Sequence, residues 1–242
     1  MITNLGYICA FIPKFMIKNI QHIILVVFTI GFVTLSYSQK RNYDIKNGIG
    51  ISGGLTQYDI ITDNFNTKKG NGWAAGLTAS VMLPHKWYGV SYSMQLAENN
   101  FSVEGRQSNV FNTTEDIEYK LLTAQLSFLL HVKLIESYVT FDLGPMLQYN
   151  ADLELKDENQ ENYLINNFET VTAQDITPIS RFNVNGAVGL SAGFSHFKLK
   201  AQYIYGFLNT LNKLNDEAFN ELNRTNFKGN QSMVVLTAQV TF

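Results

Sequence analysis

The final stretch of the chain, residues 231–242, alternates between apolar and hydrogen-bonding side chains, and this feature constrains the fold most strongly. One parity is almost wholly apolar and holds Ser232, Val234, Leu236, Ala238, Val240 and Phe242. The other parity carries most of the hydrogen-bonding groups and holds Gln231, Met233, Val235, Thr237, Gln239 and Thr241. A period of two is typical of a β-strand whose two faces meet different surroundings.

Seven earlier segments show the same period, so eight strands are predicted in all. Their ranges are 47–59, 72–83, 87–98, 117–132, 137–149, 181–194, 197–208 and 231–242. The connections alternate between short ones, at 84–86, 133–136 and 195–196, and long polar ones, at 60–71, 99–116, 150–180 and 209–230. An even strand number with this asymmetry is typical of barrels in bacterial outer membranes. We therefore predict an all-β fold, an eight-stranded antiparallel transmembrane β-barrel with up-and-down topology, whose tight turns are periplasmic.

The apolar parities of the predicted strands are wide, and aromatic residues gather near strand ends. The fourth strand, for example, sets Leu122, Ala124, Leu126, Phe128, Leu130 and Val132 against Thr123, Gln125, Ser127 and His131. Aromatic girdles of this kind lie at membrane interfaces. The polar parity is rich in small and amide side chains that suit a narrow filled lumen. The alternative is a soluble barrel or sandwich in which the apolar parity points inward, because alternation alone does not assign the faces.

The first 38 residues have the three parts of a secretory signal peptide. Lys14 and Lys18 precede an uncharged apolar run at 23–35, and Ser36 and Ser38 place small residues before a cut at Gln39. That run is shorter than the ~20 residues of a transmembrane helix, which is the alternative reading. We expect removal of 1–38 and a single barrel domain at 39–242. Residues 1–15 add nothing that a signal requires, so the start is either Met1 or Met16.

Charge and cysteine content exclude several classes of function. Loss of the predicted signal removes two of the 18 basic residues and none of the 20 acidic ones, so the formal charge changes from −2 to −4. No basic surface for nucleic acid is expected. Cys9, the single cysteine, leaves with the signal, so the mature chain has no disulfide, thiolate metal site or lipidated cysteine.

Four segments together resemble the small porin-like, PorT-type family of outer-membrane β-barrel proteins. They are Gly48–Gly54 in the first strand, Asp116–Tyr119 leading into the fourth, Thr140–Pro145 in the fifth and Ala201–Gly206 in the seventh. The resemblance implies the cell outer membrane as location and membrane lipid as a partner. Separately, the last strand with its terminal aromatic, Phe242, resembles the closing strand of outer-membrane β-barrels, whose terminus is read by the barrel-insertion machinery. Some members of the family serve protein secretion, which the resemblance extends to this chain as a possible role.

No catalytic constellation is predicted. His22 lies in the signal, His85 and His196 lie in short turns, and His131 lies at the periplasmic end of the fourth strand. None is placed to act with a serine or aspartate of an outer loop, as a lipid-modifying barrel enzyme would require. His131 is expected to be a lumenal hydrogen-bonding residue. The chain is therefore predicted not to be an enzyme, with no catalytic, cofactor-binding or metal-binding residues and no cofactor.

Charged residues of the predicted lumen have two interpretations. Asp142, Lys198 and Lys200 all project inward, either as an ion-selective constriction or as a neutralising salt bridge in a packed interior. The salt bridge is favoured because the interior of an eight-stranded barrel is about filled by side chains.

Two long connections carry candidate binding features. The third, 150–180, concentrates Asp152, Glu154, Asp157, Glu158 and Glu161 around Lys156. Such a cluster can bind calcium, but a solvated acidic loop is favoured because no EF-type turn glycine is present. The fourth connection spaces Leu211, Leu214, Ala218 and Leu222 at helical intervals within 210–223. This spacing predicts a short amphipathic helix that caps the barrel mouth or meets a partner.

The sequence therefore predicts a monomeric outer-membrane scaffold with a largely plugged lumen. Its long loops, above all 99–116 and 150–180, are expected to meet an extracellular or envelope partner. Three alternatives stay open at this point: an accessory of a secretion apparatus, a narrow porin for small solutes, and a soluble periplasmic barrel that binds an apolar ligand.

Overall fold

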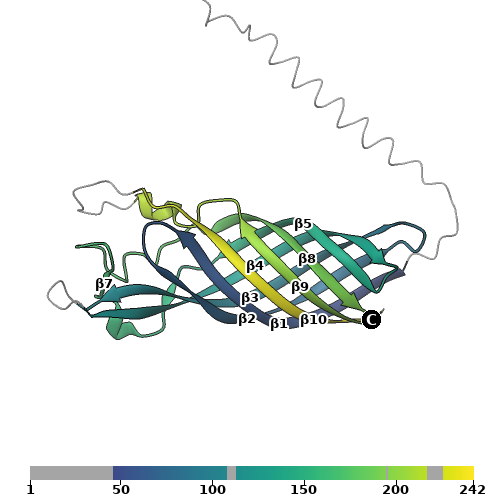
Figure 1. The fold of residues 1–242 in the computed structure, drawn as a ribbon, viewed down its shortest axis with the longest axis horizontal. Helices are drawn as coiled ribbons and strands as arrows, with labels where there is room; N and C mark the ends of the chain where they lie inside the picture. Colours follow the sequence, from purple (N-terminus) through teal and green to yellow (C-terminus); the bar gives the residue numbers. More distant parts are fainter. Residues whose placement is uncertain (1–45, 108–112, 195, 217–225) are drawn as a thin grey trace, which may run out of the picture. The chain divides into compact units, whose positions relative to one another are not determined.

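A computed structural model describes residues 46–107, 113–194, 196–216 and 226–242. Long antiparallel strands form a barrel (Figure 1). The barrel strands are β1 (Lys46–Thr62), β2 (Thr67–Met82), β3 (Tyr88–Arg106), β4 (Thr114–Ile135), β5 (Val139–Asn150), β8 (Phe182–Gly193), β9 (Phe197–Gly206) and β10 (Gly229–Thr241). They correspond to the eight predicted strands. The predicted signal peptide, 1–38, lies outside the described residues.

Each barrel strand pairs with its neighbours in the chain, and the last strand closes the ring on the first. β10 pairs antiparallel with β1 from Gly50↔Thr241 to Thr62↔Gly229, and β3 pairs with β4 from Tyr88↔Val132 to Arg106↔Thr114. The predicted eight-stranded antiparallel β-barrel with up-and-down topology is confirmed. Closure leaves none of these eight strands as a free sheet edge.

The apolar parity faces outward around the barrel. In β10 the side chains of Val234 and Leu236 are 42% and 55% exposed, whereas Gln231 and Gln239 of the other parity are buried. Leu126 and Leu190 are likewise exposed on β4 and β8. The alternative in which the apolar parity points into a dry core is therefore wrong. Within the described ranges, no helix is both long and apolar enough to cross a membrane.

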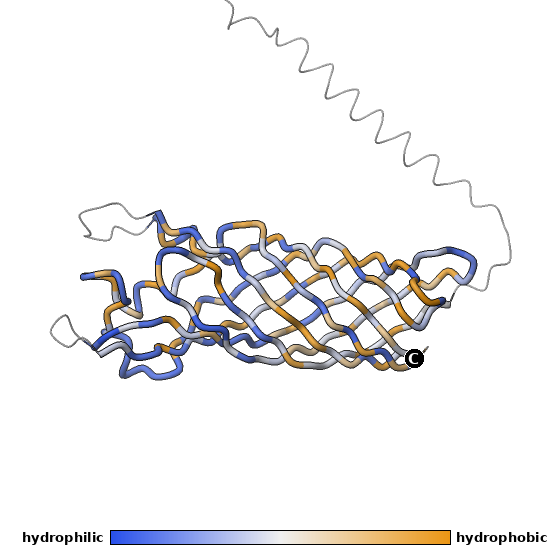
Figure 2. Tube along the Cα trace, viewed as in Figure 1, coloured by the Kyte–Doolittle hydropathy of each residue, from blue (hydrophilic) through white to orange (hydrophobic). Residues whose placement is uncertain are grey.

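The two ends of the barrel differ as predicted. At one end, which we name the turn end, short connections join β2 to β3, β4 to β5 and β8 to β9. The second of these was predicted at 133–136, but β4 continues to Ile135 and the turn is made around Glu136, whose φ is 47°. The opposite end, which we name the loop end, carries the long connections and is the more hydrophilic (Figure 2).

Two of the four predicted long loops are mostly strand. β1 and β2 leave only 63–66 between them, where a loop at 60–71 was predicted. β3 and β4 leave only 107–113, where 99–116 was predicted, and their ladder runs on to Arg106↔Thr114. The polar residues of these segments suggested loops, but they occupy one face of continuing strands.

The two remaining connections contain short elements. The segment 151–181 holds β6 (Glu154–Leu155), the 3₁₀ helix η1 (Glu158–Gln160) and β7 (Leu164–Ile165). β6 adds to β4 and β7 adds to β3, each through two residue pairs. The segment 207–228 holds the 3₁₀ helix η2 (Asn212–Asp216). These elements lie at the loop end of the barrel (Figure 1).

Candidate functional site: the lumen and its cap

The outward face of β3 changes from apolar to polar partway along the strand. Tyr92, Met94 and Leu96 are exposed and apolar, whereas the next outward positions are Glu98, Asn100, Ser102 and Glu104. The inward face changes in the opposite sense, from Ser91, Ser93 and Gln95 to Phe101 and Val103. Both faces therefore exchange their character within the same few residues of one continuous strand.

The outward faces of the neighbouring strands change from apolar to polar at about the same level. Outward Leu96 lies between Ala75 and Ala124 in the register, and one step further out Glu98 lies between Trp73 and Leu122. Beyond that level the outward positions of β4 are Lys120, Glu118 and Asp116, and β2 continues with Asn71. A shared level on the outward faces of three strands shows that this boundary is not a local irregularity of β3.

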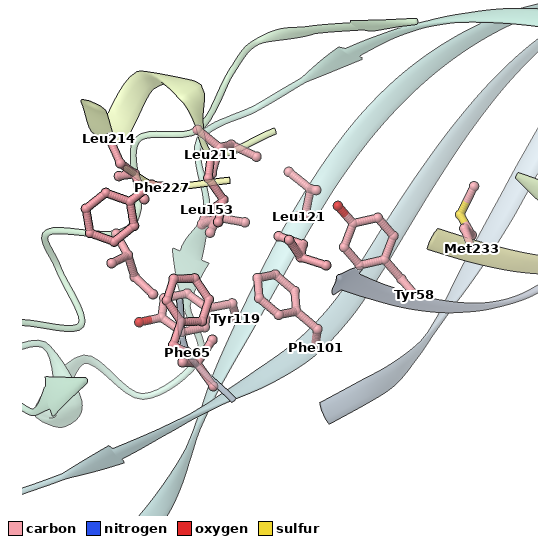
Figure 3. Packing of buried hydrophobic residues seen from close by; sticks show 14 of the residues in the cluster. Tyr58, Phe65, Phe101, Tyr119, Leu121, Leu153, Leu211, Leu214, Phe227 and Met233 are labelled. Carbon is pink, nitrogen blue, oxygen red and sulfur yellow. The ribbon is translucent and has the colours of Figure 1, made fainter. Parts of the chain in front are cut away.

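Beyond the boundary, inward side chains form a hydrophobic cluster inside the loop end (Figure 3). Phe101 stacks on Tyr119 with ring centroids 5.5 Å apart, and Tyr58 lies tilted against Phe101 at 5.8 Å. Ile60, Val103, Ile117 and Leu121 extend the cluster, and all are buried. These residues lie in β1, β3 and β4, close to the boundary or beyond it.

The connection 151–181 folds over this cluster, and we refer to it as the cap. Its apolar side chains are buried: Leu153, Ile165, Phe168, Val171, Ala173, Ile176 and Ile179. Two strand side chains hold its backbone: the Tyr119 hydroxyl donates to the Ala173 carbonyl at 2.9 Å, and Arg106 donates to the Phe168 carbonyl at 2.8 Å. The cap is therefore anchored on the barrel by a shared hydrophobic cluster and by hydrogen bonds from strand side chains.

The acidic residues of the cap point to solvent and form ion pairs at its edges. Lys120 pairs with Glu154 at 2.7 Å, and Lys156 pairs with Glu118 at 3.0 Å. The hydrogen bond from Lys120 to the Glu154 carboxylate raises the pKa of the Lys120 ammonium. Sequence reasoning identified this acidic surface but missed the apolar anchors beneath it. Their spacing follows neither a helical nor a strand period, so no sequence pattern predicted that they would be buried.

The fourth connection also contributes to the cluster. Leu211 and Leu214, two of the four residues that predicted an amphipathic helix, are buried in it, and η2 spans Asn212–Asp216. Phe227 stacks on Phe168 of the cap with ring centroids 5.6 Å apart. Ala218 and Leu222 lie outside the described residues. The described part of this connection therefore packs onto the barrel mouth, in agreement with the capping interpretation.

Amide side chains meet across the middle of the lumen. Gln148 of β5 donates through Nε2 to Gln231 of β10 at 2.7 Å and to Asn150 at 2.6 Å. Its Oε1 accepts from Gln125 of β4 at 3.0 Å and from Asn185 of β8 at 2.9 Å. All five side chains are buried. Because β5 and β10 are separated by two strands in the ring, this network spans the lumen instead of following its wall.

Nearer the turn end, a buried polar relay joins three consecutive strands. His131 Nδ1 lies 2.6 Å from Asp142 Oδ1, and His131 Nε2 lies 2.7 Å from Ser91 Oγ. Thr140 and Ser191 also donate to the Asp142 carboxylate. An ionised carboxylate only accepts, so Nδ1 carries a proton, and in the neutral ring Nε2 accepts from Ser91. The prediction that His131 is a lumenal hydrogen-bonding residue is confirmed.

The predicted salt bridge from Asp142 to Lys198 or Lys200 is wrong. Lys198 and Lys200 do project inward from β9, but among the described residues the ion-pair partner of Asp142 is His131. Sequence alone did not reveal this, because His131 and Asp142 become direct neighbours only through the register of β4 on β5. The order serine, histidine, carboxylate matches that of a nucleophile, a base and its orienting group.

The turn end of the lumen contains a cavity of about 610 Å³, which we name the vestibule. It extends from Ser91 and Lys200, which are buried, to Glu136 and His196, which are exposed in two of the short turns. The vestibule therefore reaches solvent at this end. In the part of the chain that the structure describes, no group of three or more His, Cys, Asp or Glu side chains is placed to hold a metal ion.

Comparisons with known proteins give structural neighbours only. No family model matches the chain, and no curated protein matches its sequence. The crystal structure of Neisserial surface protein A is 11% identical over 80% of this chain and 97% of its own, with a TM-score of 0.45. Ail of Yersinia pestis, crystallised with the heparin analogue sucrose octasulfate, is 14% identical over 81% and 99%, with a TM-score of 0.44. The resemblance to the PorT-type family stays a prediction.

Proposed function

We propose that this chain is an integral outer-membrane protein, and the exchange of both faces at one level of the barrel carries the proposal. A strand that stays in water does not need to expose apolar side chains for part of its length and bury them for the rest. The exposed apolar positions of β4 run from Leu122 to Leu134. They span about 41 Å of strand, or about 31 Å along the axis at a typical tilt, against ~30 Å of bilayer hydrocarbon.

The orientation follows from the two ends. The turn end faces the periplasm and the loop end faces the outside, as in barrels of this class. Outer-membrane lipid is the partner of the apolar band, and the closed ring needs no second copy, so the protein acts as a monomer. Phe242 is exposed beside β1, with its backbone N–H donating to the Ile49 carbonyl at 2.8 Å. This position is suited to recognition by the barrel-insertion machinery.

Single-cysteine labelling tests this placement, because the expected mature chain contains no cysteine. Leu96→Cys and Ser102→Cys place thiols on the outward face of β3, on either side of the boundary. We expect a membrane-impermeant maleimide to label Ser102→Cys on intact cells and to leave Leu96→Cys unlabelled. Equal labelling of the two variants in folded protein would refute the placement.

The function that we propose is a scaffold that presents its cap to an extracellular or envelope partner. A cap whose apolar residues are packed on the barrel and whose acidic residues are exposed is a stable surface for a binding partner, unlike a solvated loop. Photo-crosslinking groups at exposed Asn162 or Asn167 would capture that partner, with a group at His85 in a short turn as the control. Capture of the same partner from both ends would argue against the cap as the binding surface.

We propose further that the lumen does not conduct. The amide network around Gln148 and the cluster around Phe101 both obstruct it. Planar-bilayer recording of the purified barrel is expected to give no porin-scale conductance. Steady conductance of the wild-type protein would favour the narrow porin instead.

We also propose that the protein is not an enzyme, although Ser91, His131 and Asp142 have the order of a catalytic relay. Ser91 is only 2% exposed, and its hydroxyl is engaged by His131. A fluorophosphonate probe that reacts with activated serines is expected to leave the folded barrel unlabelled. Labelling that Ser91→Ala abolishes would show a hydrolytic site and overturn this proposal.

A further inference from the structure

Two lysines project into the vestibule without a partner. Lys198 and Lys200 both line it, and Lys200 is only 8% exposed. Lys200 lies between Ser191 of β8 and Thr237 of β10 in the register, so strands flank it on both sides. Among the residues that the structure describes, neither ammonium group has a hydrogen bond or an ion pair.

Asp142 is the buried acid that would neutralise these lysines, but its oxygens are already occupied. Oδ1 accepts from His131 Nδ1 at 2.6 Å and from Thr140 Oγ1 at 2.7 Å, and Oδ2 accepts from Ser191. Asp142 attracts both lysines through space, but it lies beyond the 4 Å of an ion pair. With three donors already bound, the carboxylate keeps about one free acceptor site and cannot coordinate two ammonium groups as well.

Among the described charged side chains that line the vestibule, Lys198 and Lys200 face a single acidic one, Glu136. Lys133 lies close enough to repel Lys198, and its ammonium donates to the Leu83 carbonyl at 2.7 Å. Glu136 lines the rim, but it is exposed to solvent and forms no ion pair with either inward lysine. A buried ammonium without a direct counter-ion is unfavourable, because attraction through space offsets only part of the cost of removal from water. The two ammonium groups therefore give the vestibule the positive charge that an anion-binding site needs.

We propose that the vestibule binds an oxyanion, a phosphate or a phosphate ester, through the ammonium groups of Lys198 and Lys200. A volume of about 610 Å³ is much larger than the ~30 Å³ share of a water molecule, so the bound group can belong to a larger molecule. The opening beside His196 and Glu136 lets such a molecule enter from the turn end. This inference does not depend on the partner that the cap binds.

The test uses the mature barrel refolded from denaturant into detergent micelles, which removes any co-purified anion. Titration with inorganic phosphate, and separately with glycerol phosphate, is followed by calorimetry at constant ionic strength, with chloride as the competing anion. We expect saturable binding of at least one phosphate species. Tighter binding of glycerol phosphate would identify an ester as the ligand, and tighter binding of inorganic phosphate would identify the free ion. No saturable binding of either would overturn the proposal.

The variant Lys200→Met distinguishes two interpretations of Lys200: that its ammonium group binds an anion, or that it is only hydrated. The variant is expected to weaken phosphate binding at least about tenfold, which corresponds to about 1.4 kcal/mol. It is also expected to unfold at a higher temperature than the wild type in buffer without phosphate, because an unpaired buried charge is removed. Lys86→Met, in an exposed short turn, is the matched control and should bind phosphate as the wild type does. Unchanged binding by Lys200→Met, or equal loss in Lys86→Met, would overturn the proposal.

Discussion

At the residue scale, the polar side chains of the amide network and of the relay around Asp142 are stabilised by partners on other strands. Asp142 is the clearest case, because donors from three strands converge on one buried carboxylate. The sequence indicated which residues point inward, since parity alone decides this. It did not indicate which inward residues pair. Those partners depend on register, and in a barrel a shift of two residues keeps the faces and changes every partner.

Asp142→Ala is expected to destabilise the barrel by roughly 1–3 kcal/mol, because it leaves buried hydrogen-bonding groups without their acceptor. Unfolding in urea, followed by loss of the folded band on unheated gels, measures the change. Ser137→Ala, in an exposed turn at the same end, should leave the midpoint unchanged. Equal midpoints for Asp142→Ala and the wild type would mean that the relay adds nothing to stability.

Gly54 tests the seam that closes the ring. A Cβ at this position would collide with the Leu236 carbonyl of β10. We expect Gly54→Val to separate β1 from β10 locally and to reduce the yield of folded, heat-modifiable barrel. Gly53→Val is the matched control, because a Cβ there meets no atom closer than 3.9 Å. A normal folding yield for Gly54→Val would show that the seam accommodates a side chain.

At the element scale, the strands were predictable within the apolar band and not beyond it. Residues 117–132 reveal a strand because Leu122 to Val132 alternate with polar residues. Residues 99–106 have the same period, but with Phe101 and Val103 inward and Asn100 and Glu104 outward. The reversed phase was interpreted as a polar loop. A comparison of consecutive strands, each with polar outward and apolar inward positions past the apolar band, would have revealed that β3 and β4 extend beyond it.

The cap was not predictable, because long-range contacts define it. Its segment 151–181 contains only short elements, and bonds such as that from Tyr119 to Ala173 link residues far apart in the chain. A segment of this kind folds when a partner surface already exists, here the cluster on β1, β3 and β4. The cap should therefore unfold separately from the barrel below it.

Ile165→Ser tests this independence. Ile165 is fully buried beneath the cap, and loss of its side chain is expected to cost roughly 2–4 kcal/mol. We expect trypsin to cleave after Lys156 in this variant while the barrel stays heat-modifiable. Asn162→Ser, at an exposed cap position, should resist cleavage as the wild type does. Loss of the folded barrel in Ile165→Ser would show that cap and barrel form one cooperative unit.

At the scale of the whole barrel domain, the lumen is divided into successive layers. Along β4 the inward residues are His131 at the vestibule, Gln125 in the amide network and Tyr119 in the cluster beneath the cap. The outward face changes once, from lipid-suited to water-suited residues, near Leu122. The change from apolar to polar side chains on the outward face marks where the membrane would end. The change from polar to apolar side chains on the inward face marks where a hydrophobic core can form. One boundary therefore organises both faces.

Leu126→Lys and Ser102→Lys test that boundary at opposite sides of it. Both residues are outward on paired strands, but Leu126 lies within the exposed apolar band and Ser102 lies past its edge. A lysine deep in the lipid face costs about 2–4 kcal/mol, and one near or beyond the interface costs about 0–1 kcal/mol. We therefore expect Leu126→Lys to lower the unfolding midpoint and the folding yield in lipid bilayers, with Ser102→Lys close to the wild type. The contradicting result would come from refolding without detergent or lipid. If Leu126→Lys then gave more soluble protein than the wild type, with the same stability, the apolar band would lie in water.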